Sequence, residues 1–237
     1  QELVAGSGSN TDPNGMATPF VADEDQDRNA EIIYAGDLKG NVWKYTLDGD
    51  GNWVPGVSGD ALLFEAENNS GDVQSITSQV NVGLNDENEK VVTFGTGKYL
   101  EPGDGSNFEV QHLYGLIDTG NKLELGDLQE QTFEEDLTRN GNDFRVLSDN
   151  SLDDSDDGWY VSLDMSDGAE EGERAIVQPV IRDGKAIFVT TVPSKTACDP
   201  GGSSWITAVD LDNGGRPAGS FFDVDGDEEI DDGDKVN

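Results

Sequence analysis

The segment Ile32–Leu47 reads Ile-Ile-Tyr-Ala-Gly-Asp-Leu-Lys-Gly-Asn-Val-Trp-Lys-Tyr-Thr-Leu, and it decides the fold. Its first five residues are β-branched, aromatic or small, as in a buried strand. Its last seven residues place aromatic and aliphatic side chains among polar ones, as in a strand with one face in the core. A short turn rich in Gly and Asp joins the two runs. The segment therefore predicts an antiparallel β-hairpin.

An acidic loop, Asp23–Glu31, stands immediately before this hairpin. Carboxylates occupy its first, third, fifth and ninth positions, and the carbonyl of the residue at the seventh can add a further oxygen. These residues are Asp23, Asp25, Asp27, Glu31 and, for the carbonyl, Asn29. Oxygen ligands at alternating loop positions suit Ca²⁺, which takes roughly six to eight of them. The sequence therefore predicts a calcium loop attached to the hairpin.

A second loop near the end of the chain repeats this spacing. Its candidate ligands are Asp223, Asp225, Asp227, the carbonyl of Glu229, Asp231 and, at the twelfth position, Asp234. An EF-hand places its bidentate carboxylate at that twelfth position and a glycine at the sixth. Arg28 and Glu228 replace that glycine in the two loops, which raises the cost of the turn. Chance clustering is the alternative interpretation in so acidic a chain, but two loops with one spacing favour calcium.

The hairpin pattern returns twice along the chain, which predicts an internal repeat. Each repeat has a first strand, a β-branched central strand, an aromatic amphipathic strand and a final strand. We expect these at 17–21, 32–36, 41–47 and 61–65, then at 75–82, 91–97, 112–118 and 159–163, and then at 175–181, 186–192, 204–211 and 220–223. Arg182–Lys185 is a hairpin turn signal, and the polar insertion contains a candidate surface helix over Leu125–Leu137.

Tandem four-stranded antiparallel units are typical of β-propeller blades, so the predicted fold is an all-β propeller. The blades are expected at about 17–66, 75–164 and 174–223, after a flexible lead-in over 1–16 and with the C-terminal calcium loop at 223–234. A β-sandwich is the alternative architecture. Propellers usually have about four to eight blades, so about three blades imply part of a larger, modified propeller. Its open edges would be covered by upstream blades of a longer parent protein or by a partner.

Charge and composition exclude several functions. Among 237 residues there are 14 Lys and Arg against 50 Asp and Glu, a net charge of −36. Such a charge repels phosphate, so nucleic-acid binding and electrostatic docking on anionic lipid are not expected. No apolar run approaches the roughly 20 residues of a membrane span.

The residues also argue against catalysis and against zinc. His112 is the only histidine, and we expect it to have a structural or surface role rather than a catalytic one. The chain has no nucleophile-elbow or phosphate-loop motif, so we expect it not to be an enzyme, and the His and Cys clusters of a zinc site are absent. Cys198 is the only cysteine, and it is either a buried thiol or paired with another part of the parent protein.

The motifs resemble, in order, those of the PilY/PilC family of type IV pilus tip adhesins. The acidic loop with Tyr34–Lys44 is similar to the hallmark of that family, and Phe94–Leu100 with Tyr114–Asp118 is similar to its next block. The similarity continues through Gly158–Tyr160, Gly172–Arg174, Pro193–Ser194, Cys198, Gly201–Gly202 and Ser204–Trp205, and it covers about Gly15 to Asp234.

This resemblance implies a modified β-propeller at the C-terminal end of a large secreted protein. It implies export through the periplasm to the cell surface or pilus tip, and roles in pilus extension, twitching motility and attachment. It also implies a calcium site that regulates pilus retraction, mapped onto the loop 23–31, in which Glu31 stands where the family often has Asp. Partners would be minor pilins of the pilus tip or other parts of the parent protein. The receptor stays open because no Arg-Gly-Asp motif is present.

The sequence leaves two other functions open as alternatives. A quinoprotein-type propeller enzyme also carries Trp-containing blade strands, but it needs a closed propeller with a funnel of carboxylate and basic side chains. A calcium-stiffened extracellular spacer domain would need no receptor of its own.

Overall fold

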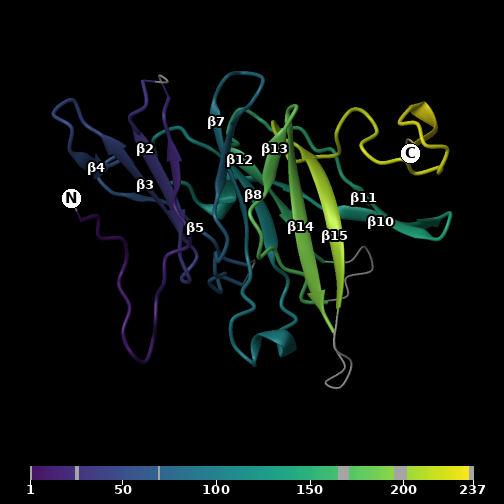
Figure 1. Cartoon of the computed structure of the whole chain (residues 1–237), viewed down its shortest axis with the longest axis horizontal. Helices are drawn as coiled ribbons and strands as arrows, with labels where there is room; N and C mark the ends of the chain where they lie inside the picture. The colour runs from purple at the N-terminus through teal and green to yellow at the C-terminus, as the bar shows by residue number, and fades with distance from the viewer. Residues whose placement is uncertain (1, 25–26, 69, 165–170, 195–201, 235–237) are drawn as a thin grey trace.

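Three mainly antiparallel sheets lie side by side in sequence order (Figure 1). The computed structural model describes residues 2–24, 27–68, 70–164, 171–194 and 202–234, so Asp25 and Cys198 lie outside the described residues. Sheet I contains β1 (Phe20–Ala22), β2 (Ile32–Gly36), β3 (Asn41–Leu47), β4 (Trp53–Pro55) and β5 (Leu62–Glu65). Sheet II contains β6 (Asn81–Leu84), β7 (Lys90–Gly95), β8 (His112–Ile117), β12 (Gly158–Ser162) and β9 (Gln129–Gln131). Sheet III contains β13 (Val180–Arg182), β14 (Lys185–Pro193) and β15 (Gly202–Asp210).

The insertion between β9 and β12 forms a separate hairpin, β10 (Phe133–Arg139) with β11 (Asn142–Leu147). In Figure 1 this hairpin projects beyond sheet III, close to the C-terminal segment. Short 3-10 turns stand at Asp104–Ser106, Leu125–Asp127 and Asp232–Asp234. The described residues therefore form an all-β structure, as the strand pattern predicts.

Sheet II is buried on both faces because its strands alternate between two cores. Val92, Phe94, Tyr114 and Tyr160 pack toward sheet I, and Phe64 of β5 joins the same core. The residues that alternate with them along the strands pack toward sheet III: Val91, Leu113, Trp159, Val161, with Ala186, Phe188 and Val209 from sheet III. Successive side chains of a strand point to opposite faces, so one sheet can separate two cores. Stacked sheets with cores between them are the arrangement expected of neighbouring blades.

Trp159 is the largest fully buried side chain of the chain's described part. Its strand β12 pairs with β8 so that Trp159 lies opposite Gly115. A Cβ on Gly115 would stand 2.2 Å from the indole ring, and one on Gly214 would stand 2.3 Å from it. Both glycines therefore make room for the indole, whose Nε1–H donates to the carbonyl of Leu211 at 3.0 Å. This bond ties sheet II to the chain segment that follows β15.

Most predicted strands are confirmed, but the first strands of the second and third repeats, expected at 75–82 and 175–181, begin later, as β6 and β13. Two further local predictions are wrong. The hairpin of β2 and β3 has the predicted bounds, and the turn after Arg182 places Asp183 at φ 50° and Gly184 at φ 69°. The predicted helix over Leu125–Leu137 is instead one 3-10 turn followed by strands, because β9 pairs with β12 and β10 pairs with β11. Tertiary pairing here overrides the helix propensity of Glu and Gln.

The second wrong prediction concerns the end of the third repeat. Ser220–Asp223 forms no strand, and the described residues give sheet III three strands where four were expected. Pro217 cannot donate to a ladder, and the carboxylate of Asp223 accepts N–H groups of its own loop, from Gly226 at 2.6 Å and from Glu228 at 3.0 Å. The chain therefore leaves the sheet and enters the second acidic loop.

The lead-in, of which residues 2–16 are described, contacts sheet I at several points. Tyr45 donates its hydroxyl hydrogen to the carbonyl of Val4 at 2.7 Å, and Asn14 donates to the buried Asp37 at 2.9 Å. Burial alone would raise the pKa of Asp37, but hydrogen bonds from Asn14, Trp43 and Asn41 outweigh it, so the pKa lies below its usual value. Asp37 thus organises the turn of the hairpin and holds the lead-in against it.

Candidate metal centres

The first acidic loop connects β1 to β2 and is closed by their ladder. Ala22 pairs with Ile32, and the N–H of Glu31 donates to the carbonyl of Ala22 at 2.9 Å. Carboxylate oxygens of Asp23, Asp27 and Glu31 lie within 4.8 Å of one another. The hairpin therefore brings together three of the predicted ligands.

The backbone of this loop turns at its sixth position. Arg28 has a φ of 77°, in the left-handed region that favours glycine, and its N–H donates to Asp23 at 2.9 Å. The N–H of Asn29 donates to Asp27 at 2.7 Å. The loop thus adopts at Arg28 the turn for which an EF-hand uses glycine. The prediction for Asp25 lies outside the described residues, and the carbonyl role predicted for Asn29 stays a prediction.

The second acidic loop repeats these features. Carboxylate oxygens of Asp223, Asp225 and Asp227 lie within 4.8 Å of one another. Its sixth position, Glu228, has a φ of 71°. Partial desolvation and the negative charges of neighbours, Asp227 first among them, raise the pKa of Asp225. Crowded carboxylates that resist ionisation are the electrostatic condition that a bound cation relieves.

Asp234 closes the second loop through the backbone. Its carboxylate accepts the N–H groups of Asp231 at 2.9 Å, Val224 at 2.6 Å and Asp225 at 3.1 Å. These bonds, that from Asp231 foremost, lower the pKa of Asp234. Asp231 accepts the N–H of Gly233 at 2.6 Å, and neither Asp231 nor Asp234 belongs to the three-carboxylate group found among the described residues. The ligand roles predicted for Glu229, Asp231 and Asp234 stay predictions.

The donor set of both loops fits calcium and not zinc. Each group offers carboxylate oxygens only, on a loop exposed to solvent. Hard cations prefer oxygen, whereas structural zinc uses His and Cys. Both groups use carboxylates of the first and fifth loop positions. The first loop adds the ninth position and the second loop adds the third.

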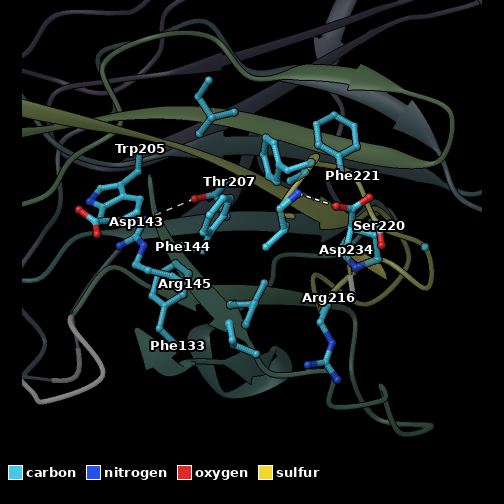
Figure 2. A pocket seen from close by; sticks show the side chains of 18 of the residues that line it. Phe133, Asp143, Phe144, Arg145, Trp205, Thr207, Arg216, Ser220, Phe221 and Asp234 are labelled. Carbon is cyan, nitrogen blue, oxygen red and sulfur yellow. Dashed lines mark hydrogen bonds between the residues drawn. The ribbon is translucent and has the colours of Figure 1, made fainter. Parts of the chain in front are cut away.

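A groove of about 690 Å³ lies between β11, β15 and the segment 216–222, and sequence reasoning did not find it. Figure 2 shows Trp205 and Arg145 close together at one end of it and Phe221 at the other end. The signal available in the sequence was the apolar content of 144–147, where Phe144, Val146 and Leu147 place apolar side chains on the hairpin.

Arg145 lies in the wall of this groove, and its guanidinium has both an ionic and an aromatic set of partners. It donates to Glu173 through two nitrogens, at 2.6 and 2.9 Å, and the two side chains are 3% and 2% exposed. Its guanidinium carbon lies 3.9 Å from the ring centre of Phe133 and 4.2 Å from that of Trp205. Because Glu173 neutralises it, Arg145 orders the two rings and adds little positive charge to the groove.

His112 is buried, in agreement with the expected structural role. Its Nδ1 lies 2.6 Å from Oε1 of Gln74, an acceptor, so Nδ1 carries the hydrogen and Nε2 bears the lone pair. Among the described residues Nε2 has no hydrogen-bond partner. Burial lowers the pKa of His112 to about 4, so the ring is neutral at pH 7.

The single histidine gives a testable pH dependence. The unfolded chain takes up a proton near pH 6.5 and the native chain only near pH 4, so acidification between these values favours unfolding. We expect a loss of about 2 kcal/mol of unfolding free energy between pH 7 and pH 5. Urea unfolding at both pH values measures it. In His112→Asn, whose amide replaces Nδ1, this part of the pH dependence should disappear, and an unchanged dependence would contradict the assignment.

Among the residues that the structure describes, no helix has the length and apolar character needed to cross a membrane.

The chain is similar to proteins of one family. The family model for the PilY1 beta-propeller domain matches residues 3–151. A Type IV pilus biogenesis factor PilY1 homolog of Xylella fastidiosa is 31% identical over 87% of this chain and 15% of its own length. The Type IV pilus biogenesis factor PilY1 of Pseudomonas aeruginosa PAO1 is 28% identical over 90% of this chain and 22% of its own length.

The structural comparison agrees with the family model. The crystal structure of the Pseudomonas aeruginosa PilY1 C-terminal domain superposes with a TM-score of 0.80 and 27% identity, over 95% of this chain and 53% of that one. The chain thus spans about half of that solved domain and less than a quarter of the two full-length relatives. The fold is that of a β-propeller rather than a sandwich, and the chain belongs to the PilY1 β-propeller domain family.

Proposed function

We propose that this chain is the calcium-binding propeller portion of a type IV pilus biogenesis factor that acts outside the cell. There it supports calcium-regulated pilus extension and retraction, twitching motility and attachment to surfaces or host cells. The observation that carries the calcium part is the agreement of two separate loops, each with three converging carboxylates and a left-handed sixth residue. The pilus part is supported by relatives named Type IV pilus biogenesis factor PilY1.

The proposed location is the cell surface or pilus tip, reached through the periplasm. The proposed partners are minor pilins of the tip or other parts of the same protein, and the receptor is left open. The proposed role is structural and adhesive, without catalysis, since the relatives carry the name of pilus biogenesis factors. The surface carries a large negative charge, −36 in total, which binding of divalent cations would reduce.

Calcium, when bound, would supply positive charge between carboxylates that otherwise repel one another. In the first loop Asp23, Asp27 and Glu31 would hold it, and in the second Asp223, Asp225 and Asp227. Each loop leads directly into packed structure: the first into β2, and the second back to the wall of the groove through Val224 and Asp234. Calcium is therefore expected to order both loops and the elements beside them.

A calcium titration by calorimetry on the chelator-stripped chain tests this proposal. We expect two sites per chain, with Asp27→Ala abolishing one and Asp225→Ala abolishing the other, since each removes a carboxylate from one group. Asp154→Ala is the matched control, because Asp154 is an exposed carboxylate in an acidic run outside both groups. Absence of saturable binding by the unmodified chain would refute the calcium proposal. If Asp154→Ala lost as much calcium binding as the loop variants, the binding would be nonspecific attraction of calcium by the net charge.

The biological part is tested in the full-length pilus factor of which we propose this chain to be a portion. Introducing Asp27→Ala into that protein should alter twitching motility and surface piliation if the first loop regulates the pilus. Normal motility together with lost calcium binding would favour the spacer alternative.

A further inference from the structure

Among the described residues, the outer edge of β15 is unpaired, whereas the corresponding edges of the other sheets are paired. In sheet I the third strand, β3, is paired along its outer edge with β5 over Asn41–Trp43 and with β4 over Tyr45–Leu47. In sheet II the third strand, β8, pairs with β12 over His112–Leu116. In sheet III no strand of the described residues pairs with β15 on the side away from β14. The described part of the third repeat therefore has no final strand on β15.

The direction of the main-chain groups identifies the free positions. The N–H of Asp210 donates to Gly215, and its carbonyl accepts from Gly214, both at 2.9 Å, so the Asp210 peptide groups face away from β14. Along an antiparallel strand every second residue shares this direction. The residues concerned are Ala208, Ile206 and Ser204, and no group of the described residues bonds to their main chain on this side. Three donors and three acceptors thus stand in a row.

The groove runs along this same edge. Its lining includes Ser204, Ile206 and Ala208 together with Phe144, Phe221 and Phe222. Figure 2 shows the aromatic side chains distributed along it. Ile206 is 55% exposed, which is unusual for a residue in the middle of a nine-residue strand. An extended peptide would find main-chain partners on β15 and apolar contacts in the groove.

The charge around the groove specifies the chemistry of the occupant. Asp143, Asp149 and Asp234 line it together with Arg216, and Arg145 is neutralised by Glu173, so acidic groups outnumber the remaining basic one. The hairpin beside it carries the exposed run Glu134–Asp136, and the second acidic loop forms the opposite rim. A second copy of this chain, with its own charge of −36, would be repelled. A segment with Lys or Arg beside its apolar residues would be attracted.

We propose that the edge of β15 and the adjoining groove bind an extended, basic segment of another protein, which pairs antiparallel with β15 as the missing fourth strand. Main-chain bonds to Ser204, Ile206 and Ala208 hold the segment. Its alternate apolar side chains enter the groove, and its flanking Lys or Arg residues meet the acidic rim.

The first test uses a synthetic peptide of alternating Val and Thr with two Lys at each end. A matched peptide has Glu in place of Lys. We expect saturable binding of the Lys peptide, with amide exchange at Ile206 and Ala208 slowed, and binding of the Glu peptide at least about tenfold weaker. Absence of saturable binding by the Lys peptide, or equal binding of both peptides, would overturn the proposal.

The second test removes one donor while leaving the fold in place. Ile206→Pro deletes an N–H that points away from β14, so the β14–β15 ladder keeps its bonds. We expect the dissociation constant of the Lys peptide to rise at least about fivefold. Ile206→Val, which keeps the N–H, is the control and should change it less than about twofold. Equal binding by the proline and valine variants, with circular dichroism unchanged, would contradict strand pairing.

The third test distinguishes the source of the strand. In the longer natural protein, free of partners, the amides of Ile206 and Ala208 should exchange as fast as in the 237-residue chain. Protection of these amides in the longer protein alone would mean that its own chain covers β15, and the proposal of a separate partner would fail. This readout uses unmodified protein, so it does not depend on the folding of any variant.

Discussion

Replacing Asp118 by Ala is expected to lower the unfolding free energy by about 3–5 kcal/mol, because it leaves a buried lysine charge without its partner. Lys44 lies 2.6 Å from Asp118, and the two side chains are 9% and 1% exposed. Tyr34, which pairs with Lys44 across β2 and β3, donates its hydroxyl hydrogen to the same carboxylate. Asp118 follows β8, so this cluster joins sheet I to sheet II.

The tyrosine adds to the cost of the substitution. Burial first, and the negative charge of Asp118 second, raise the pKa of Tyr34 well above its usual value, so the hydroxyl stays protonated and donates. Without Asp118 both the ammonium and the hydroxyl lose a buried acceptor. The effect is thus larger than that of one ion pair.

Urea unfolding of three variants measures this prediction. Glu101→Ala is the surface control: its contact with Lys98 is 3.7 Å long and the side chains are 37% and 67% exposed, so we expect a change below about 1 kcal/mol. The double variant Lys44→Met with Asp118→Ala removes both charges and should recover more than half of the loss. If Asp118→Ala cost no more than Glu101→Ala, the cluster would not couple the sheets.

Replacing Trp159 by Ala is the second large effect, and we expect a loss of about 3–5 kcal/mol. The indole is fully buried, contacts the ring of Phe188 edge-on at 6.4 Å between centres, and lies in the space left by Gly115 and Gly214. Truncation opens a cavity that rigid strands on both sides cannot close. It also leaves the carbonyl of Leu211 without the indole donor.

The reciprocal change tests the same packing from the other side. Gly115→Ala places a methyl group 2.2 Å from the indole, so Trp159 or its strand must move, and we expect a loss of more than about 2 kcal/mol. Gly184→Ala is not a suitable control, because Gly184 has a φ of 69°. Gly126→Ala is suitable, since an added Cβ there meets nothing within 4 Å. Thermal unfolding should rank Gly126→Ala as mildest, and a Gly115→Ala protein as stable as Gly126→Ala would contradict the account.

The strands and loop spacings were readable in the sequence because they depend on neighbours within a few residues. The bounds of β2 and β3 follow from their β-branched and aromatic runs, and the turn at Asp183 and Gly184 needs only their own backbone freedom. The positions of acidic residues in each loop follow from the same local geometry. These features would be the same in any fold that kept the hairpins.

Tertiary structure decided which of these elements meet. The pairing of Lys44 with Asp118 spans 74 residues, and the bond from Trp159 to Leu211 spans 52. Neither pair has a local signal, because each depends on how whole sheets stack. The same holds for the strands that replace the predicted helix over Leu125–Leu137 and for the loop that replaces the predicted strand Ser220–Asp223. Local pattern fixes the conformation of a segment, whereas burial against distant segments selects its partners. The unpaired edge of β15 in the described residues is a property of strand pairing between distant segments, so the sequence pattern did not reveal it.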